Sequence, residues 1–388
     1  MVDKLPSPLR RVLLLAGLAG SCGMGRAAEF KARTLVFPRD FGSHPDTRTE
    51  WWYITGYASS GATGTTGTAG TAGTAGAADA GARLFGFQIT FFRSRVDGTQ
   101  DMQSSFAAKQ LLFAHAAITD VQGKKLWHDQ RMARSTGASD IKAAAASEKD
   151  TAIRLRDWSL VRKGNEYNVV ALGADFQLNL QFRETQPLML QGDKGLSRKG
   201  PQPQQASFYY SKPQMAVAGS LTVKGQMMAV EASRGVAWLD HEWSNEVLPP
   251  GAVGWDWIGM NLFDGSALTA FRLRDKSGNT VWDGGSFRHP KMNPPDRPHV
   301  FSRGEVIFQA SRGWKSPLTQ ANYPVEWLVR TPADYYIVKA LVDNQELDSR
   351  GTTGAVYWEG LADLFDSNNR HVGRGYLEMT GYAKPLRM

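Results

Sequence analysis

The stretch "DFQLNLQF" at residues 175–182 alternates strictly between apolar and polar side chains. Because successive side chains of a β-strand point to opposite faces, this pattern is typical of a strand with one buried face. Similar apolar or aromatic runs, separated by Gly, Pro, Asn and Asp, occur at 50–58, 83–94, 220–233, 266–275, 323–331, 334–342 and 354–364. The sequence therefore predicts an all-β chain of barrels or sandwiches.

The length of 388 residues exceeds the size at which one core usually stops growing, so we expect two domains. We place them at 36–235 and 236–388. Residues 59–82 form a tract of Gly, Thr and Ala between two predicted strands, which indicates an expanded hairpin loop. The Ala-rich segment "SDIKAAAASEKD", residues 139–150, is the one stretch that favours a short helix.

The first 28 residues resemble an export signal. Arg10 and Arg11 precede the apolar run "VLLLAGLAG", and small residues offer a cleavage site near Ala28. We therefore expect a periplasmic or secreted protein. The single cysteine, Cys22, lies within this segment. It is either discarded with the signal or lipidated as a membrane anchor, and in both cases the mature fold has no disulfide.

The composition points to an ordinary globular protein, with 42% hydrophobic and 21% charged residues. The net charge is +8, but no basic run stands out, which argues against nucleic-acid binding. The sequence also lacks a G-x-S-x-G elbow, an HExxH motif, a CxxC pair and a Walker loop.

Two neighbouring stretches combine acids with indoles: "GVAWLDHEWS" (235–244) and "GWDWIGMNLFDG" (254–265). A carboxylic acid desolvated among aromatic rings keeps its proton near neutral pH and can donate it to an alkene. Aromatic faces can then stabilise the resulting carbocation, and water can complete a hydration. Asp240 or Asp256 could be this acid, with His241 orienting it. The surrounding candidates are Trp238, Trp243, Trp255 and Trp257. The plainer alternative is that these residues pack a core and cap turns.

Strand alternation limits which of these residues can act together. On a strand, Asp240 and Glu242 share one face and His241 points to the other, which splits the potential metal ligands. We therefore predict no metal site. In the same way, Trp51 and Tyr53 share one face of the first strand, whereas Glu50 and Trp52 share the other.

Several motifs resemble the AttH/CrtC-like family of carotenoid 1,2-hydratases, kievitone hydratase and predicted secreted hydrolases. They include "HPDTRTEWWYITG" (44–56), "AWLDHEWS" (237–244), "GWDWIGMNLFDG" (254–265) and "GRGYLEMTGY" (373–382). The resemblance implies two tandem lipocalin-like β-barrels with a ligand cavity near their junction. It also implies cofactor-independent addition of water to an isolated double bond of an isoprenoid.

The resemblance carries over to particular residues. His241 and Trp243 match the His-x-Trp element of the hydratases, and Asp256 or Asp264 matches their acid. The tyrosine that accompanies this acid in those enzymes is replaced here by Trp or Phe. We expect Trp51, Tyr53 and His44 to contribute to the cavity as well. His115 is an even choice between a core and a functional residue, and Glu359 and Glu378 are expected to be buried, hydrogen-bonded structural acids.

Two other functions remain open at this point. A non-catalytic periplasmic carrier would use the same cavity to hold a hydrophobic ligand, and a secreted hydrolase would cleave one. In each case we expect a monomer whose partner is a hydrophobic small molecule, without a cofactor.

Overall fold

The computed structural model describes residues 32–60, 82–104, 107–135, 143–246, 248–292 and 297–386. Within these ranges the regular structure is two antiparallel β-sheets and two 3-10 turns, η1 (Arg39–Phe41) and η2 (Asp97–Thr99). The predicted all-β fold is thus confirmed. The predicted signal segment 1–28 and residues 61–81 of the Gly/Thr/Ala tract lie outside the described residues.

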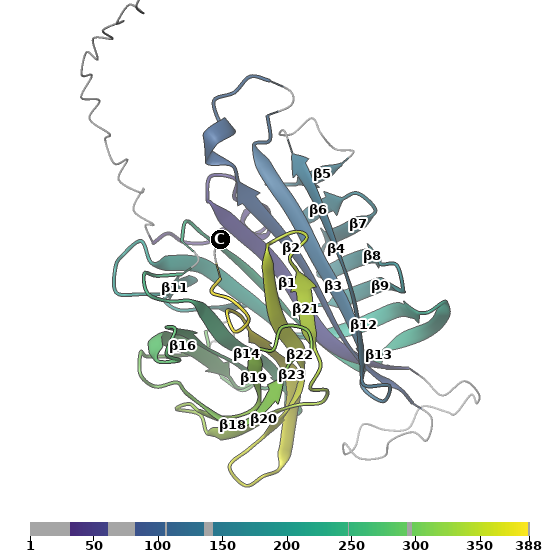
Figure 1. Ribbon diagram of the computed structural model, residues 1–388, viewed down its shortest axis with the longest axis vertical. Helices are drawn as coiled ribbons and strands as arrows, with labels where there is room; N and C mark the ends of the chain where they lie inside the picture. The colour runs from purple at the N-terminus through teal and green to yellow at the C-terminus, as the bar shows by residue number, and fades with distance from the viewer. Residues whose placement is uncertain are drawn as a thin grey trace, which may run out of the picture.

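The first sheet holds thirteen strands in the described part of the chain (Figure 1, purple to teal). They are β1 (Thr49–Ser60), β2 (Leu84–Arg95), β3 (Gln110–Asp120), β4 (Lys125–Ser135), β5 (Ala144–Ala146), β6 (Ala152–Leu155), β7 (Trp158–Lys163), β8 (Glu166–Leu172), β9 (Phe176–Arg183), β10 (Met189–Leu190), β11 (Leu196–Arg198), β12 (Ala206–Val223) and β13 (Gln226–Ser244). Their order is β4-β3-β2-β1-β13-β12-β9-β8-β7-β6-β5, with β10 and β11 paired to β12. The two ends of this order approach each other, and Arg131 of β4 donates a hydrogen bond to the carbonyl of Leu172 on β8. The sheet is therefore a nearly closed barrel.

The second sheet has ten strands among the described residues (Figure 1, green to yellow). They are β14 (Gly254–Leu262), β15 (Ala267–Arg274), β16 (Thr280–Arg288), β17 (His299–Phe301), β18 (Ile307–Lys315), β19 (Asn322–Arg330), β20 (Tyr335–Ala340), β21 (Glu346–Ser349), β22 (Ala355–Phe365) and β23 (His371–Met379). Their order is β17-β16-β15-β14-β23-β22-β20-β19-β18, and β21 pairs with β22. The sheet surrounds its own apolar core, which includes Ile258, Phe308 and Trp327.

One domain boundary and one secondary-structure element differ from the sequence predictions. β13 continues past Gly235 to Ser244 and pairs with β1 and β12 along this length, so residues 236–244 belong to the first sheet. The division between the sheets lies between Ser244 and Gly254, a segment that contains the turn-forming residues Pro249 and Pro250. The expected helix at 139–150 is also wrong where it is described: Ala144–Ala146 form β5, whose Ala144 is buried in the barrel core.

A third apolar cluster fills the junction between the sheets. Tyr53 and Trp238 from the first sheet meet Trp257, Phe271 and other side chains of the second. Strand alternation explains this arrangement, because each central strand sends one set of side chains into its own core and the other set to the junction. No helix of the described chain is long and apolar enough to cross a membrane.

Candidate functional site

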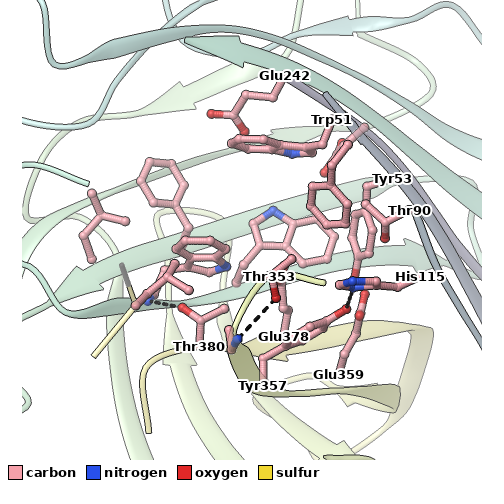
Figure 2. A pocket seen from close by; sticks show the side chains of 18 of the residues that line it. Trp51, Tyr53, Thr90, His115, Glu242, Thr353, Tyr357, Glu359, Glu378 and Thr380 are labelled. Carbon is pink, nitrogen blue, oxygen red and sulfur yellow. Dashed lines mark hydrogen bonds between the residues drawn. The ribbon is translucent and has the colours of Figure 1, made fainter. Parts of the chain in front are cut away.

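A pocket that is partly open to solvent lies at the junction of the two sheets. Aromatic side chains from both sheets form most of its wall, and Figure 2 shows acids and hydroxyl groups among them. The lining residues that matter here are Trp51, Tyr53, His115, Lys199, Tyr209, Asp240, Glu242, Trp255, Trp257, Phe271, Tyr357, Glu359 and Glu378. This concave, mainly apolar space with a few polar groups has the character of a small-molecule site.

Asp240 is the predicted acid that the structure places in this pocket. Its carboxylate accepts hydrogen bonds from Ser211 Oγ at 2.5 Å, Tyr209 Oη at 2.7 Å and Trp238 Nε1 at 2.6 Å. Burial raises the pKa of Asp240 to about 7, although these three hydrogen bonds oppose the rise. The group can therefore exchange a proton near neutral pH. Trp238 is not part of the pocket wall and acts on it through this bond.

Two further acids of the pocket belong to the second sheet. Glu359 on β22 and Glu378 on β23 are direct cross-strand partners, and both line the cavity. Burial raises the pKa of each, and the neighbouring charge of Glu378 raises that of Glu359 further. Glu359 is buried, as expected, although among the described residues its Oε1 has no hydrogen-bond partner. Tyr357 and Glu359 are two residues apart on β22, so strand alternation places both side chains on one face. This spacing is the feature of the sequence that could have predicted that both line the pocket.

His115 joins the two sheets at one side of the pocket. Its Nδ1 lies 2.7 Å from Tyr357 Oη and its Nε2 lies 2.7 Å from Thr352 Oγ1, so a residue of β3 is tied to the second sheet (Figure 2). Burial lowers the pKa of His115 to about 3. The ring is therefore neutral at physiological pH.

This shift predicts a loss of stability on acidification. Below the unfolded-state pKa of 6.5 the unfolded chain binds a proton at His115 that the folded protein refuses, so the free energy of unfolding falls as the pH drops from there toward about 3. The contribution of His115 between about pH 6.5 and about pH 5 is roughly 2 kcal/mol. We expect His115→Gln to have a shallower pH dependence in urea unfolding. The exposed His128 and the buried His241 also have lowered pKa values and remain in the variant, so the difference between variant and wild type reports on His115. A pH dependence of stability identical to that of the wild type would show that His115 titrates normally.

His241 does not reach the pocket, contrary to its predicted role beside the acid. It lies on the opposite face of β13, inside the first barrel, where its Nε2 is 2.8 Å from Glu50 Oε1 and its Nδ1 is 2.9 Å from Tyr210 Oη. His44 lies in the same cluster, 2.7 Å from Glu50, and its ring stacks on Trp243 with centroids 3.8 Å apart. The assignment of His44 and Trp243 to the cavity is therefore also wrong, since both side chains face the barrel interior.

The cluster of His44, Glu50 and His241 brings three potential metal ligands within 4.8 Å of one another. Its contacts are those of an ion-pair network. Glu50 Oε1 lies at hydrogen-bond distance from both rings, closer than the roughly 3.3 Å that separates two ligands of a tetrahedral zinc ion. The other oxygen of Glu50 accepts a hydrogen bond from the fully buried guanidinium of Arg93 at 2.8 Å. These residues fit a structural charge cluster better than a metal centre.

Asp256 is likewise directed away from the pocket. It is fully buried on the core side of β14, where it accepts hydrogen bonds from Arg272 Nε at 2.7 Å and Tyr382 Oη at 2.9 Å. Its neighbours Trp255 and Trp257 line the pocket because they occupy the other face of the same strand. Asp264 accepts a hydrogen bond from the backbone of Ser266 in the following turn. Of the three predicted aspartates, Asp240 is the one in the pocket.

Comparison with known proteins identifies relatives of this fold. A proposed AttH from Nitrosomonas europaea, solved by crystallography, is 40% identical, with a TM-score of 0.77 over 91% of this chain and 99% of that chain. Kievitone hydratase from Nectria haematococca has a TM-score of 0.65 at 12% identity, over 90% of this chain and 94% of that chain. CghA has a TM-score of 0.50 at 11% identity, over 90% of this chain and 94% of that chain. The last two similarities show a common fold. No protein with curated information matches the sequence.

These comparisons confirm the family resemblance and the lipocalin-like, hydratase-like fold expected from the motifs. The sequence model of the AttH-like family matches residues 73–382, which is most of the chain. The protein belongs to the AttH-like family.

Proposed function

We propose that the protein is a cofactor-independent hydratase that adds water to an isolated double bond of an isoprenoid or a similar apolar lipid. The observation that carries this proposal is a buried carboxyl group with a pKa of about 7, that of Asp240, in the wall of an aromatic pocket. The hydratase-like fold supports the same reaction class.

In the proposed reaction Asp240 is both the donor and the final acceptor of one proton. Its carboxyl group protonates one carbon of the double bond, and the electron pair of that bond forms the new C–H bond. The adjacent carbon becomes a cation, which the faces of Trp51, Trp257 and Phe271 stabilise. A water molecule then forms the C–O bond, and its excess proton returns to the Asp240 carboxylate. The cycle balances without a redox partner.

The hydrogen bonds around Asp240 suit this exchange. Tyr209, Ser211 and Trp238 hold the carboxyl in one orientation and stabilise the carboxylate left after proton donation. Burial favours the protonated form in the resting state. Burial outweighs the hydrogen bonds and brings the pKa to about 7, which suits a group that donates and recovers a proton at neutral pH.

The test is mass spectrometry of lipid extracts after incubation with the protein in heavy-oxygen water. Mixed bacterial lipids and isoprenoids serve as the substrate pool. We expect a product that is heavier by one water and carries the label on a saturated carbon. Label found only in a carboxylate would instead indicate hydrolysis, and an unchanged lipid that co-purifies with the protein would indicate a carrier; either result contradicts the proposal.

A further inference from the structure

The pocket wall contains more acids than bases. Asp240, Glu242, Glu359 and Glu378 line it, whereas its single ammonium group is that of Lys199. Lys199 Nζ lies 3.0 Å from Glu242 Oε1 and thus already has a partner. In the described part of the chain, no basic side chain forms an ion pair with Asp240, Glu359 or Glu378. The cavity therefore has an unmatched acidic side.

Two polar atoms on this side lack partners although they are buried. Among the described residues, neither Tyr53 Oη nor Glu359 Oε1 has a hydrogen-bond partner. The two side chains are 6% and 2% exposed, respectively, and both line the pocket (Figure 2). The two side chains lie close enough that each shifts the pKa of the other. Buried polar groups without partners are uncommon in folded proteins, and at a cavity wall such groups are available to a ligand.

We propose that Glu359, Glu378 and Tyr53 bind the ammonium head group of a cationic amphiphile. An ammonium group brings up to three N–H donors and one positive charge, which match a free carboxylate oxygen, a free phenol oxygen and the second carboxyl group. The rings of Trp255, Trp257 and Tyr357 line the same cavity and add favourable contacts between a cation and aromatic faces. A neutral hydroxyl group could donate only one hydrogen bond and would bring no charge to stabilise an ionised glutamate.

This site also orients a ligand toward Asp240. Glu359 and Glu378 belong to the second sheet, and Asp240 belongs to β13 of the first. A head group held by the two glutamates leaves the apolar part of the ligand in the aromatic portion of the cavity. As a statement about the substrate, the inference rests on the proposed hydratase function. As a statement about binding, it stands independently.

Binding of the ammonium group is linked to proton release. Burial keeps protons on Glu359 and Glu378 in the empty pocket, and the charges of Asp240 and Glu242 on β13 act on Glu378 in the same direction. Tyr53, Tyr357 and Tyr376 also face these acids, and burial raises the pKa of each tyrosine, so they stay neutral. An ammonium ligand must therefore displace a proton from the glutamate pair. Its affinity should increase with pH until the pair is ionised.

The experiment is isothermal titration calorimetry of the full chain with octylamine and 1-octanol, which have equal chain lengths. Titrations in two buffers with different ionisation enthalpies count the protons released. We expect octylamine to bind at least about tenfold more tightly than octanol at about pH 8. We also expect release of about one proton near neutral pH and a weaker affinity for octylamine at about pH 6. Octanol should show neither pH dependence nor proton release.

Variants separate this site from general electrostatic attraction. Glu359→Gln and Glu378→Gln should each weaken octylamine binding about tenfold or more and leave octanol binding unchanged. Glu231→Gln, which removes an exposed acid from β13, should change neither. Glutamine resembles the protonated form of the acid. The free energy of unfolding of both pocket variants at alkaline pH should therefore be at least as large as that of the wild type.

Equal binding of octanol and octylamine, absence of proton release, or equal losses in Glu359→Gln and Glu231→Gln would each overturn the proposal. Amine binding without incorporation of labelled water would retain this site and remove the hydratase function. Incorporation of labelled water without preference for the amine would do the opposite.

Discussion

Replacing Glu50 with alanine is expected to lower the free energy of unfolding by about 3–5 kcal/mol. Glu50 is completely buried and interacts with His44, His241 and Arg93. Burial alone would raise its pKa, but hydrogen bonds and charges from the two histidines outweigh burial and lower it. Removing this carboxylate leaves the fully buried guanidinium of Arg93 without its counter-charge. Urea unfolding at neutral pH measures the loss.

A surface acid and a double variant provide the controls. Glu166→Ala removes a half-buried acid on β8 that contacts Gln181, and we expect a loss below about 1 kcal/mol. The double variant with Glu50→Met and Arg93→Met removes both charges together. Its loss of unfolding free energy should therefore be smaller than the summed losses of the single variants Glu50→Met and Arg93→Met. Strictly additive losses would show that Glu50 and Arg93 do not stabilise each other.

The pH dependence of this cluster has a definite sign. Because the pKa of Glu50 is lowered in the folded protein, its contribution to stability is present above the ordinary carboxyl pKa and is lost as the pH falls below it. The Glu50→Ala variant should therefore lose less stability than the wild type during acidification from about pH 5 to about pH 3. Burial and the charge network, not catalysis, explain why this "TEWWY" segment contains an acid.

Strand alternation predicted much of the arrangement. The sequence pattern separates Trp51 and Tyr53 from Glu50, and it separates Asp240 from His241. In the structure Trp51, Tyr53 and Asp240 line the pocket. Glu50 and His241 lie on the opposite faces of their strands, inside the first barrel. The same rule applied to "GWDW" separates Asp256 from Trp255 and Trp257. Proposing Asp256 as an acid among these indoles ignored that separation, and the structure places Asp256 against Arg272 instead.

Other features depend on contacts between sheets, which local patterns do not encode. A period of two tells which side chains share a face but not which face meets the other sheet. The side chains of Glu359 and Tyr53 meet at the pocket although they are far apart in sequence, because β1 packs against β23 and β2 against β22 at the junction. The prediction that His241 assists the acid was based on its position next to Asp240 in the chain. Adjacent residues of a strand point in opposite directions, so the two side chains lie on different faces of β13.

Asp240→Asn is expected to reduce turnover of labelled water into product by at least about 100-fold. Asparagine has nearly the same shape and its carbonyl oxygen can still accept hydrogen bonds from Tyr209, Ser211 or Trp238. It cannot donate and recover a carboxyl proton. Ligand binding and the folded structure should therefore persist, so that the loss appears in kcat more than in KM. In the wild type, turnover should also fall as the pH rises above about 7, because the reaction requires protonated Asp240.

Asp256→Asn is the matched control, because it makes the same chemical change in a buried aspartate of β14, the next strand along the chain, which belongs to the second sheet. Asp256 pairs with Arg272 and lies within 3.5 Å of Arg274, so this variant should lose about 3–5 kcal/mol of stability. Its folded molecules should retain turnover, since the side chain points away from the pocket. If Asp240→Asn kept full turnover while Glu359→Gln or Glu378→Gln abolished it, the proton donor would belong to the second sheet. The opposite pattern assigns proton transfer to Asp240 and leaves the glutamates to hold the ligand.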